Sequence, residues 1–122
     1  TDSNYAYQYG LPGTFAPIAD YDLLSRAVET AKRQGTDVVV GNVLSSDIFY
    51  NEMGNVNDLW RGMGVLAVEM EAAALYMNAA KAGKKALCLL TISDHLYTGE
   101  RLSAEKRQLG FNKMMEIALE LA

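Results

Sequence analysis

Three short apolar runs, each followed by polar residues, alternate with segments of helical period along this chain of 122 residues. The runs cover residues 37–43, 65–68 and 86–92 and are rich in Val, Leu and Ile, as buried strands are. Parallel strands are joined by crossover segments that are usually helices. The alternation therefore predicts an α/β domain in three layers, with helices covering both faces of one sheet.

Local signals mark where the helices begin and end. Helices are expected over residues 21–34, 56–63 and 71–82. Asp20 is expected to cap the first helix and Gly35 to end it, and Ser103 is expected to cap a last helix. The apolar face of that last helix is predicted at Phe111, Met115, Ala118 and Ala122. Residues 1–17 mix tyrosines with glycine and proline, which predicts an extended or loop lead-in.

The charge balance excludes several classes of partner. The chain has 11 Lys and Arg against 15 Asp and Glu, a formal net charge of -4, and therefore no continuous positive surface for nucleic acid or anionic membranes. No apolar run approaches the roughly 18 residues that a membrane span needs, and no signal-peptide pattern is present. We therefore expect a cytoplasmic protein without nucleic-acid or membrane partners.

Cysteine and histidine are too scarce for a metal site. Zinc usually takes three or four N, S or O ligands, and the chain has one cysteine and one histidine, so we expect no metal. Cys88 lies inside an apolar run and is expected to pack as a small hydrophobe. The chain opens on Thr1 and its first methionine is Met53, which indicates a processed or truncated piece of a longer protein.

Polar residues follow all three predicted strands. These ends read Ser45-Ser46-Asp47 leading to Phe49, Glu69-Met70-Glu71, and Ser93-Asp94-His95. In open α/β sheets, ligands bind beyond the carboxyl ends of the strands, where loop side chains and helix N-termini converge. One polar strand end is typical of any turn, whereas three of them indicate a binding site.

The same blocks carry a family resemblance. They are Gly41-Asn42 through Phe49-Tyr50, Val68 through Ala73, Thr91 through His95, and Arg107-Gln108 with Phe111-Asn112. In these blocks and their spacing, the sequence resembles the hexameric type of purine nucleoside phosphorylase, within the nucleoside phosphorylase superfamily. The resemblance covers nearly all of residues 1–122 but only the C-terminal half of the family's usual length. It implies part of a single three-layer αβα sandwich with a mixed sheet, without the N-terminal part that carries the phosphate loop.

The resemblance implies reversible phosphorolysis of purine nucleosides or deoxynucleosides to a free purine and ribose or deoxyribose 1-phosphate. Phosphate is then the co-substrate, and no cofactor is implied. Asp94 matches the general acid that protonates the purine at N7, a role worth roughly 10²–10⁴ in rate. Arg107 matches its catalytic partner. Because a guanidinium favours the ionised form of a carboxyl, Arg107 is expected to engage mainly as Asp94 loses its proton.

The other matched residues are expected to hold the nucleoside. Glu71 matches the carboxylate that accepts hydrogen bonds from both ribose hydroxyls, and Met70 matches the residue packed against the ribose. Phe49 matches the aromatic side chain beside the purine. His95 belongs to the motif but is assigned a structural role. The substrate-binding residues implied are Phe49, Val68, Glu69, Met70, Glu71 and Ser93.

Other interpretations stay open at this point. By residue type alone, Asp94 fits a turn, Glu71 a helix start and Arg107 an exposed helix face. A related nucleosidase would use water in place of phosphate, on methylthioadenosine or adenosylhomocysteine, and a non-catalytic nucleoside-binding fragment is a further alternative. Uridine phosphorylase fits the Ser93-Asp94 block less well. The resemblance also implies a homo-oligomer, a hexamer. If a complementary N-terminal chain completes the fold, the assembly is still expected to form such oligomers.

Overall fold

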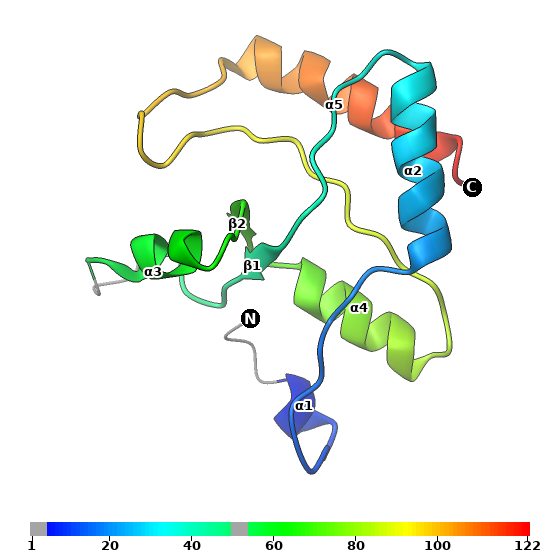
Figure 1. Ribbon diagram of the computed structural model, residues 1–122, viewed down its shortest axis with the longest axis vertical. Coiled ribbons are helices and arrows are strands. Elements are labelled where there is room, and N and C mark those ends of the chain that lie inside the picture. The colour runs from blue at the N-terminus through cyan, green and yellow to red at the C-terminus, as the bar shows by residue number, and fades with distance from the viewer. Residues whose placement is uncertain (1–4, 50–53) are drawn as a thin grey trace. The chain divides into compact units, whose positions relative to one another are not determined.

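The computed structural model describes residues 5–49 and 54–122 (Figure 1). Tyr50, part of one matched block, lies outside the described residues. The elements follow the order α1 (Tyr5–Gln8), α2 (Tyr21–Arg33), β1 (Val43–Ser45), α3 (Val56–Gly62), β2 (Ala67–Glu69), α4 (Ala72–Lys81) and α5 (Ala104–Leu119). Two compact units contain them, the first made of Thr1–Ala19 and Val39–Ala86 and the second of Asp20–Val38 and Leu87–Ala122. Helices and a parallel strand pair confirm the α/β class.

The first unit is organised around two parallel strands. β1 pairs with β2 in the register Val43 with Ala67, Leu44 with Val68, and Ser45 with Glu69. A Cβ at position 41 would lie 2.4 Å from Leu66 Cδ1, so glycine at position 41 allows the two segments to approach closely before the strands begin. α4 follows β2 directly and buries Ala72, Ala73 and Met77. The loop after α1 reaches α4, where the Tyr9 hydroxyl donates to Asn78 and Lys81 Nζ lies 4.3 Å from the Tyr9 ring centroid.

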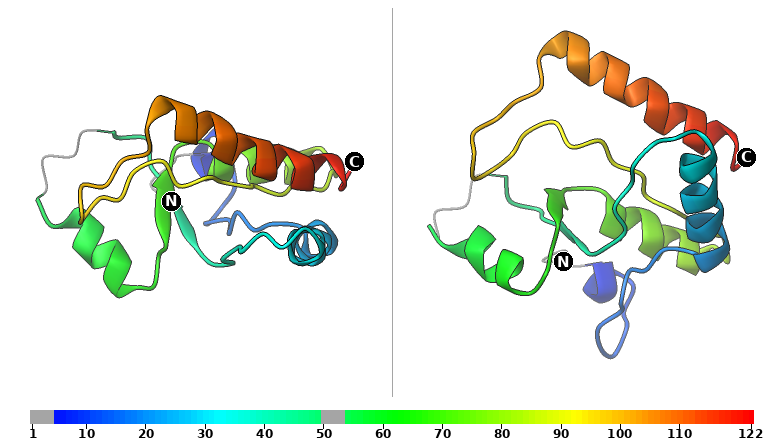
Figure 2. Two further views of the ribbon diagram at one scale, coloured as in Figure 1. Left: turned by 90° about the horizontal axis from the view of Figure 1, so that it is seen from above. Right: turned by 45° about the horizontal axis from the view of Figure 1, so that its top comes forward.

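The second unit packs α2 against α5 (Figure 2). Its buried residues are Ala27, Ala31 and Ile117, with Leu87, Leu89 and Leu121 packed around them. Polar contacts reinforce the same pair of helices, because Arg33 Nη2 lies 2.5 Å from Glu120 Oε2 and Gln34 Nε2 donates to Glu120 Oε1 at 2.9 Å. These contacts join the C-terminal end of α5 to the C-terminal end of α2.

The helix ends follow the local signals in the sequence. Asp20 Oδ1 accepts from Leu23 N at 3.0 Å, and Ser103 Oγ accepts from Lys106 N at 3.2 Å, so both predicted N-caps are confirmed. Gly35 has φ of 64° just beyond α2, and Thr36 N donates back to Ala31 O at 2.9 Å, which closes the helix in a left-handed turn. The helices expected over 21–34, 56–63 and 71–82 are confirmed to within two residues at each end.

The predicted strands are only partly present. Residues 86–92 form no strand, and the strand expected over 37–43 is present only at its last residue, Val43, where β1 (Val43–Ser45) begins. A strand exists only where a neighbouring backbone pairs with it, and in the described parts of the chain only β1 and β2 supply such a pair. Two strands do not make a sheet with helices on both faces, so the three-layer arrangement is not observed.

Two further expectations were wrong. The lead-in over residues 1–17 contains the short helix α1. The expected face of α5, at Phe111, Met115, Ala118 and Ala122, is exposed. α5 instead packs through Ile117 against the small side chains of α2, and Leu121, in the turn that follows α5, packs against the same cluster. The helical period was correct, but the choice of buried face depends on the partner helix.

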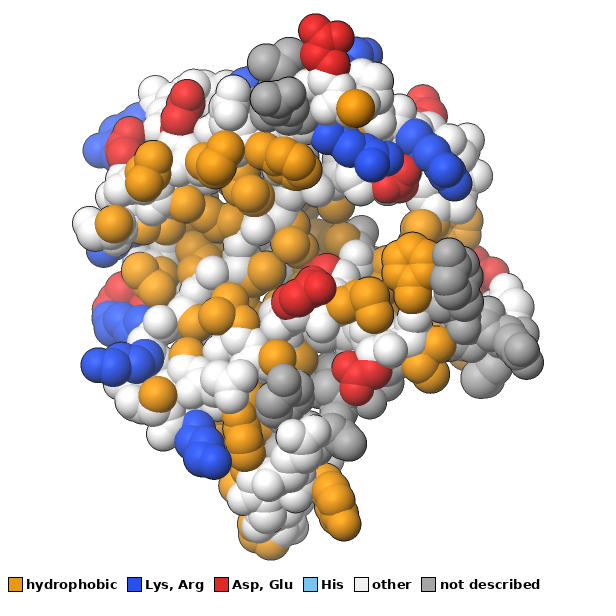
Figure 3. Space-filling view, turned by 180° about the vertical axis from the view of Figure 1, so that it is seen from behind, with side chains coloured by type: hydrophobic (Ala, Val, Ile, Leu, Met, Phe, Trp, Pro, Cys, Tyr) orange, Lys and Arg blue, Asp and Glu red, His pale blue; other side chains and the backbone are white. Residues whose placement is uncertain are grey.

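Large apolar side chains are exposed in both units. Ile18, Met63 and Leu119 are among them, and Figure 3 shows hydrophobic side chains on one face of the molecule. None of the helices in the described ranges is both long and apolar enough to cross a membrane. Within those ranges, no group of three or more His, Cys, Asp or Glu side chains is placed to hold a metal ion.

Candidate active site

The turn from β2 into α4 is built around the Glu69 carboxylate. Glu69 Oε2 accepts from Glu71 N at 2.7 Å and from Ala72 N at 2.6 Å, the first N–H groups at the start of α4. These N–H groups have no partner within the helix, so an acceptor with a negative charge is favourable there. Glu69 therefore caps α4 from the last position of β2.

Ser45 joins the end of β1 to the same turn. Its hydroxyl donates to Glu69 Oε1, and its Oγ accepts from Ala73 N at 2.9 Å. Ser45 is 6% exposed and Ala73 is 2% exposed, so the bond between them is buried, whereas the bond to Glu69 is partly buried. The sequence placed Ser45 at a polar strand end, but its link to Glu69 and α4 was missed because that link depends on the register of β1 with β2.

Four of the predicted substrate-binding residues in this unit are exposed. Glu71 is exposed, and its Oε2 accepts from Met70 N at 3.1 Å. Val68, in the middle of β2, and Met70, in the turn itself, are also exposed. Phe49, four residues after β1, is 73% exposed. A carboxylate and a thioether are groups that can bind a sugar, and an aromatic ring is a group that can stack on a flat base.

The second unit holds Asp94 in a tight loop. Leu102 N donates to Ser93 O at 2.9 Å and His95 N donates to Glu100 O at 2.8 Å, so residues 93–102 fold back on themselves. The Ser93 hydroxyl donates to Asp94 Oδ2 at 2.6 Å. Asp94 is paired with Arg101 across the loop in an isolated antiparallel bridge. Its side chain is 39% exposed and therefore accessible to a ligand.

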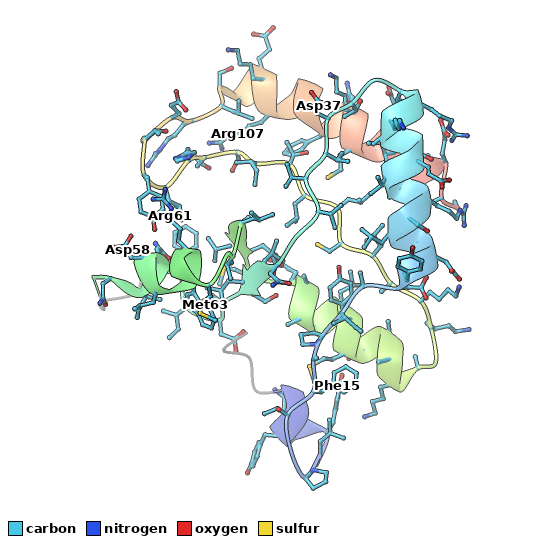
Figure 4. All side chains as sticks on the ribbon, in the orientation of Figure 1. Phe15, Asp37, Asp58, Arg61, Met63 and Arg107 are labelled. Carbon is cyan, nitrogen blue, oxygen red and sulfur yellow. The ribbon has the colours of Figure 1, made fainter. Side chains whose placement is uncertain are left out.

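Two arginines lie near Asp94. Arg107, in the first turn of α5 (Figure 4), has its Nη2 3.3 Å from Asp94 Oδ1 and is 42% exposed. Arg101 has its Nε 3.7 Å from the same oxygen and is 78% exposed. Within the described residues, the buried Nε of Arg107 has no hydrogen-bond acceptor. Arg107 and Asp94 therefore lie close together in this structure, and the proximity of Arg101 to Asp94 was not predicted from the sequence.

His95 has a structural environment. Its Nδ1 accepts from Tyr97 N at 3.2 Å and from Thr98 N at 3.1 Å, which holds the tip of the loop. An accepting Nδ1 leaves the proton of the neutral ring on Nε2. The structural role expected for His95 agrees with these bonds.

The predicted site residues thus fall into two groups. The first unit brings together the carboxyl ends of β1 and β2 with the start of α4, and it contains Phe49, Val68, Glu69, Met70 and Glu71. The second unit brings together Ser93, Asp94 and Arg107. One group offers acceptors and apolar walls, and the other offers a carboxyl group with cationic neighbours.

Comparisons with known proteins identify the family. Residues 1–121 match the family model described as "Phosphorylase superfamily". The chain is 53% identical over 108 residues to "Purine nucleoside phosphorylase DeoD-type" of Clostridium novyi, covering 88% of this chain and 46% of that protein. It is 50% identical over 123 residues to the protein of that name from Bacillus cytotoxicus, covering all of this chain and 52% of the relative. It is also 50% identical over 122 residues to that of Geobacillus kaustophilus, of which it spans 51%. The chain therefore spans about half the length of these relatives, and it belongs to the phosphorylase superfamily.

Proposed function

We propose that this chain supplies the base and ribose site of a purine nucleoside phosphorylase. The observation that carries the proposal is the Asp94 carboxyl group, which accepts from Ser93 at 2.6 Å and lies 3.3 Å from Arg107. This arrangement occurs in a chain whose sequence is 50% identical to proteins named purine nucleoside phosphorylase. The chemistry proposed is phosphorolysis of a purine nucleoside or deoxynucleoside to the free base and the sugar 1-phosphate, with phosphate as co-substrate and no cofactor.

Asp94 is proposed to act as the general acid. As the bond between the sugar C1′ and the purine N9 breaks, its electron pair moves into the base, and the Asp94 carboxyl transfers its proton to N7. A phosphate oxygen forms the new bond to C1′. The carboxylate that remains is stabilised by the Arg107 guanidinium and by the Ser93 hydroxyl, because hydrogen bonds to an ionised acceptor are stronger than neutral ones.

The first unit is proposed to hold the nucleoside. Glu71 accepts hydrogen bonds from the two ribose hydroxyls and stabilises positive charge that develops on the sugar. Met70 packs against the sugar, with Glu69 on the same side. Phe49 and Val68 line the pocket for the purine. The exposure of Glu71, Met70 and Phe49 supports these roles, because ligand-binding side chains must be accessible.

We further propose that residues 1–122 are the C-terminal part of a single domain of about twice this length. In the complete domain, residues 86–92 would form a strand of a mixed sheet in a three-layer αβα sandwich, which accounts for their apolar sequence. The complementary part would bind phosphate. Exposed apolar side chains such as Ile18, Met63 and Leu119 support assembly with other polypeptides, including a homo-oligomer of the hexameric kind.

The test uses two hybrid enzymes in which this chain replaces the matching segment of the Bacillus cytotoxicus or the Geobacillus kaustophilus relative. Folding is checked by thermal unfolding, and cleavage of inosine and adenosine is measured with and without phosphate. We expect phosphate-dependent cleavage, and a loss of roughly 10²–10⁴ in kcat for Asp94→Asn. Folded hybrids that are inactive would refute the proposal, and cleavage by water alone would favour the nucleosidase alternative.

A further inference from the structure

The buried hydroxyl of Ser45 joins three segments of the first unit. It lies at the end of β1, donates to the Glu69 carboxylate at the end of β2, and accepts from Ala73 N in the first turn of α4. Glu69 in turn accepts from the backbone N–H of Glu71 at 2.7 Å. A continuous chain of hydrogen bonds therefore runs from Ser45, through Glu69, to the backbone of Glu71.

We propose that Ser45 is a positioning residue for Glu71, acting through Glu69, and that it sets how tightly the ribose hydroxyls are bound. This inference rests on the proposed function of Glu71. Ser45 does not contact the sugar in this account. It fixes the direction in which the β2–α4 turn presents Glu71.

The burial of the hydroxyl gives it this influence. Ser45 is 6% exposed, so water cannot readily replace its hydroxyl, and Ala73 N is the backbone donor of a residue that is 2% exposed. Without the hydroxyl, Glu69 Oε1 loses the donor that Ser45 supplies, and the Glu69 side chain gains freedom to rotate away from Glu71 N. The exposed Glu71 side chain has no burial of its own to hold it in place.

If Ser45 positions Glu71, its removal should lower kcat/KM mainly for substrates that have ribose hydroxyls. A general loss of stability would lower kcat/KM equally for substrates with and without them. In the hybrid enzymes, Ser45→Ala is expected to lower kcat/KM for inosine by about tenfold or more, because small misplacements of binding groups have large effects on rate. For 2′,3′-dideoxyinosine, which offers Glu71 no hydroxyls, the same substitution is expected to change kcat/KM by less than about threefold. Ser45→Thr, which keeps the hydroxyl, is expected to restore most of the loss.

Ser46 provides a matched control. It is 8% exposed and follows Ser45 directly, but its hydroxyl donates to Ile48 O at 3.1 Å and accepts from Ile48 N at 3.2 Å, away from Glu69. Ser46→Ala is expected to leave the ratio of the inosine to dideoxyinosine rates unchanged. A change of that ratio equal to the change in Ser45→Ala would overturn the inference.

A second measurement does not depend on activity. In the 122-residue chain, amide hydrogen exchange is expected to become faster at Glu71 and Ala73 in Ser45→Ala and to remain unchanged at both in Ser46→Ala. Unchanged exchange in Ser45→Ala would refute the positioning role. Inactive wild-type hybrids would refute the proposed function instead, while equal loss with both substrates in active hybrids would refute this inference alone.

Discussion

Removal of the Glu69 carboxylate tests the capped turn on which the first unit depends. Glu69→Ala leaves Ala72 N, at a residue that is 2% exposed, without its acceptor, and an orphaned buried donor costs about 1–3 kcal/mol. The substitution also removes a negative charge from the start of α4, worth about 0.3–1 kcal/mol. Glu71 N belongs to an exposed residue, so water can replace the lost bond there. We therefore expect the free energy of unfolding to fall by about 1.3–4 kcal/mol.

Urea unfolding of the 122-residue chain, followed by far-UV circular dichroism, measures this difference. Glu69→Gln retains an oxygen that can accept from the same N–H groups and loses only the charge, so its expected cost is about 0.3–1 kcal/mol. Glu71→Ala is the matched control, because it removes a carboxylate near the same helix end that accepts only from Met70 N within the described structure. The reasoning is refuted by a Glu69→Ala cost below about 0.5 kcal/mol, or by equal costs for the Ala and Gln variants.

Three further predictions concern charge and completeness. In the hybrid enzymes, Arg107→Ala is expected to lower kcat by about 10–100-fold. Arg101 is more distant from Asp94 and more exposed, so Arg101→Ala is expected to lower kcat by less than about threefold. Equal losses in the two variants would contradict the assigned roles. Glu120→Ala is expected to lower the free energy of unfolding in urea by about 1 kcal/mol at low salt and by less at high salt. The reason is that its partners Arg33 and Gln34 lie near the surface, where salt screens charges. A loss that does not depend on salt would argue against an ionic contact. The 122-residue chain alone is expected to show little or no phosphorolysis of inosine, since it has no recognisable phosphate-cradling loop, and full turnover would overturn this.

The helices could be predicted because their signals are local. Asp20 and Ser103 each accept from a backbone N–H three residues further on, and that geometry needs nothing from the rest of the chain. Gly35 likewise ends α2 through its own backbone conformation. The buried face of α5 could not be chosen in this way, because Phe111 and Ile117 are both apolar and only the packing against α2 decides between them.

Strands and the polar network of the site depend on distant segments. The apolar run 86–92 has the composition of a strand, but without a paired neighbour it has no strand structure. The Ser45–Glu69 contact follows from the register of β1 with β2, which the sequence does not specify over three residues. Asp94 and Arg107 were predicted from a motif match, and in the structure Arg107 Nη2 lies 3.3 Å from Asp94 Oδ1. The proximity of Arg101 arises from the folding back of residues 93–102, which no motif predicted.

A crystal structure of a hybrid enzyme with bound inosine, grown without phosphate, tests the central claim most directly. We predict the Asp94 carboxyl within about 3 Å of the purine N7, and the Glu71 carboxylate within about 3 Å of both ribose hydroxyls of the same bound nucleoside. A nucleoside bound away from either carboxyl group, or Asp94 and Glu71 in unconnected surroundings, would contradict it.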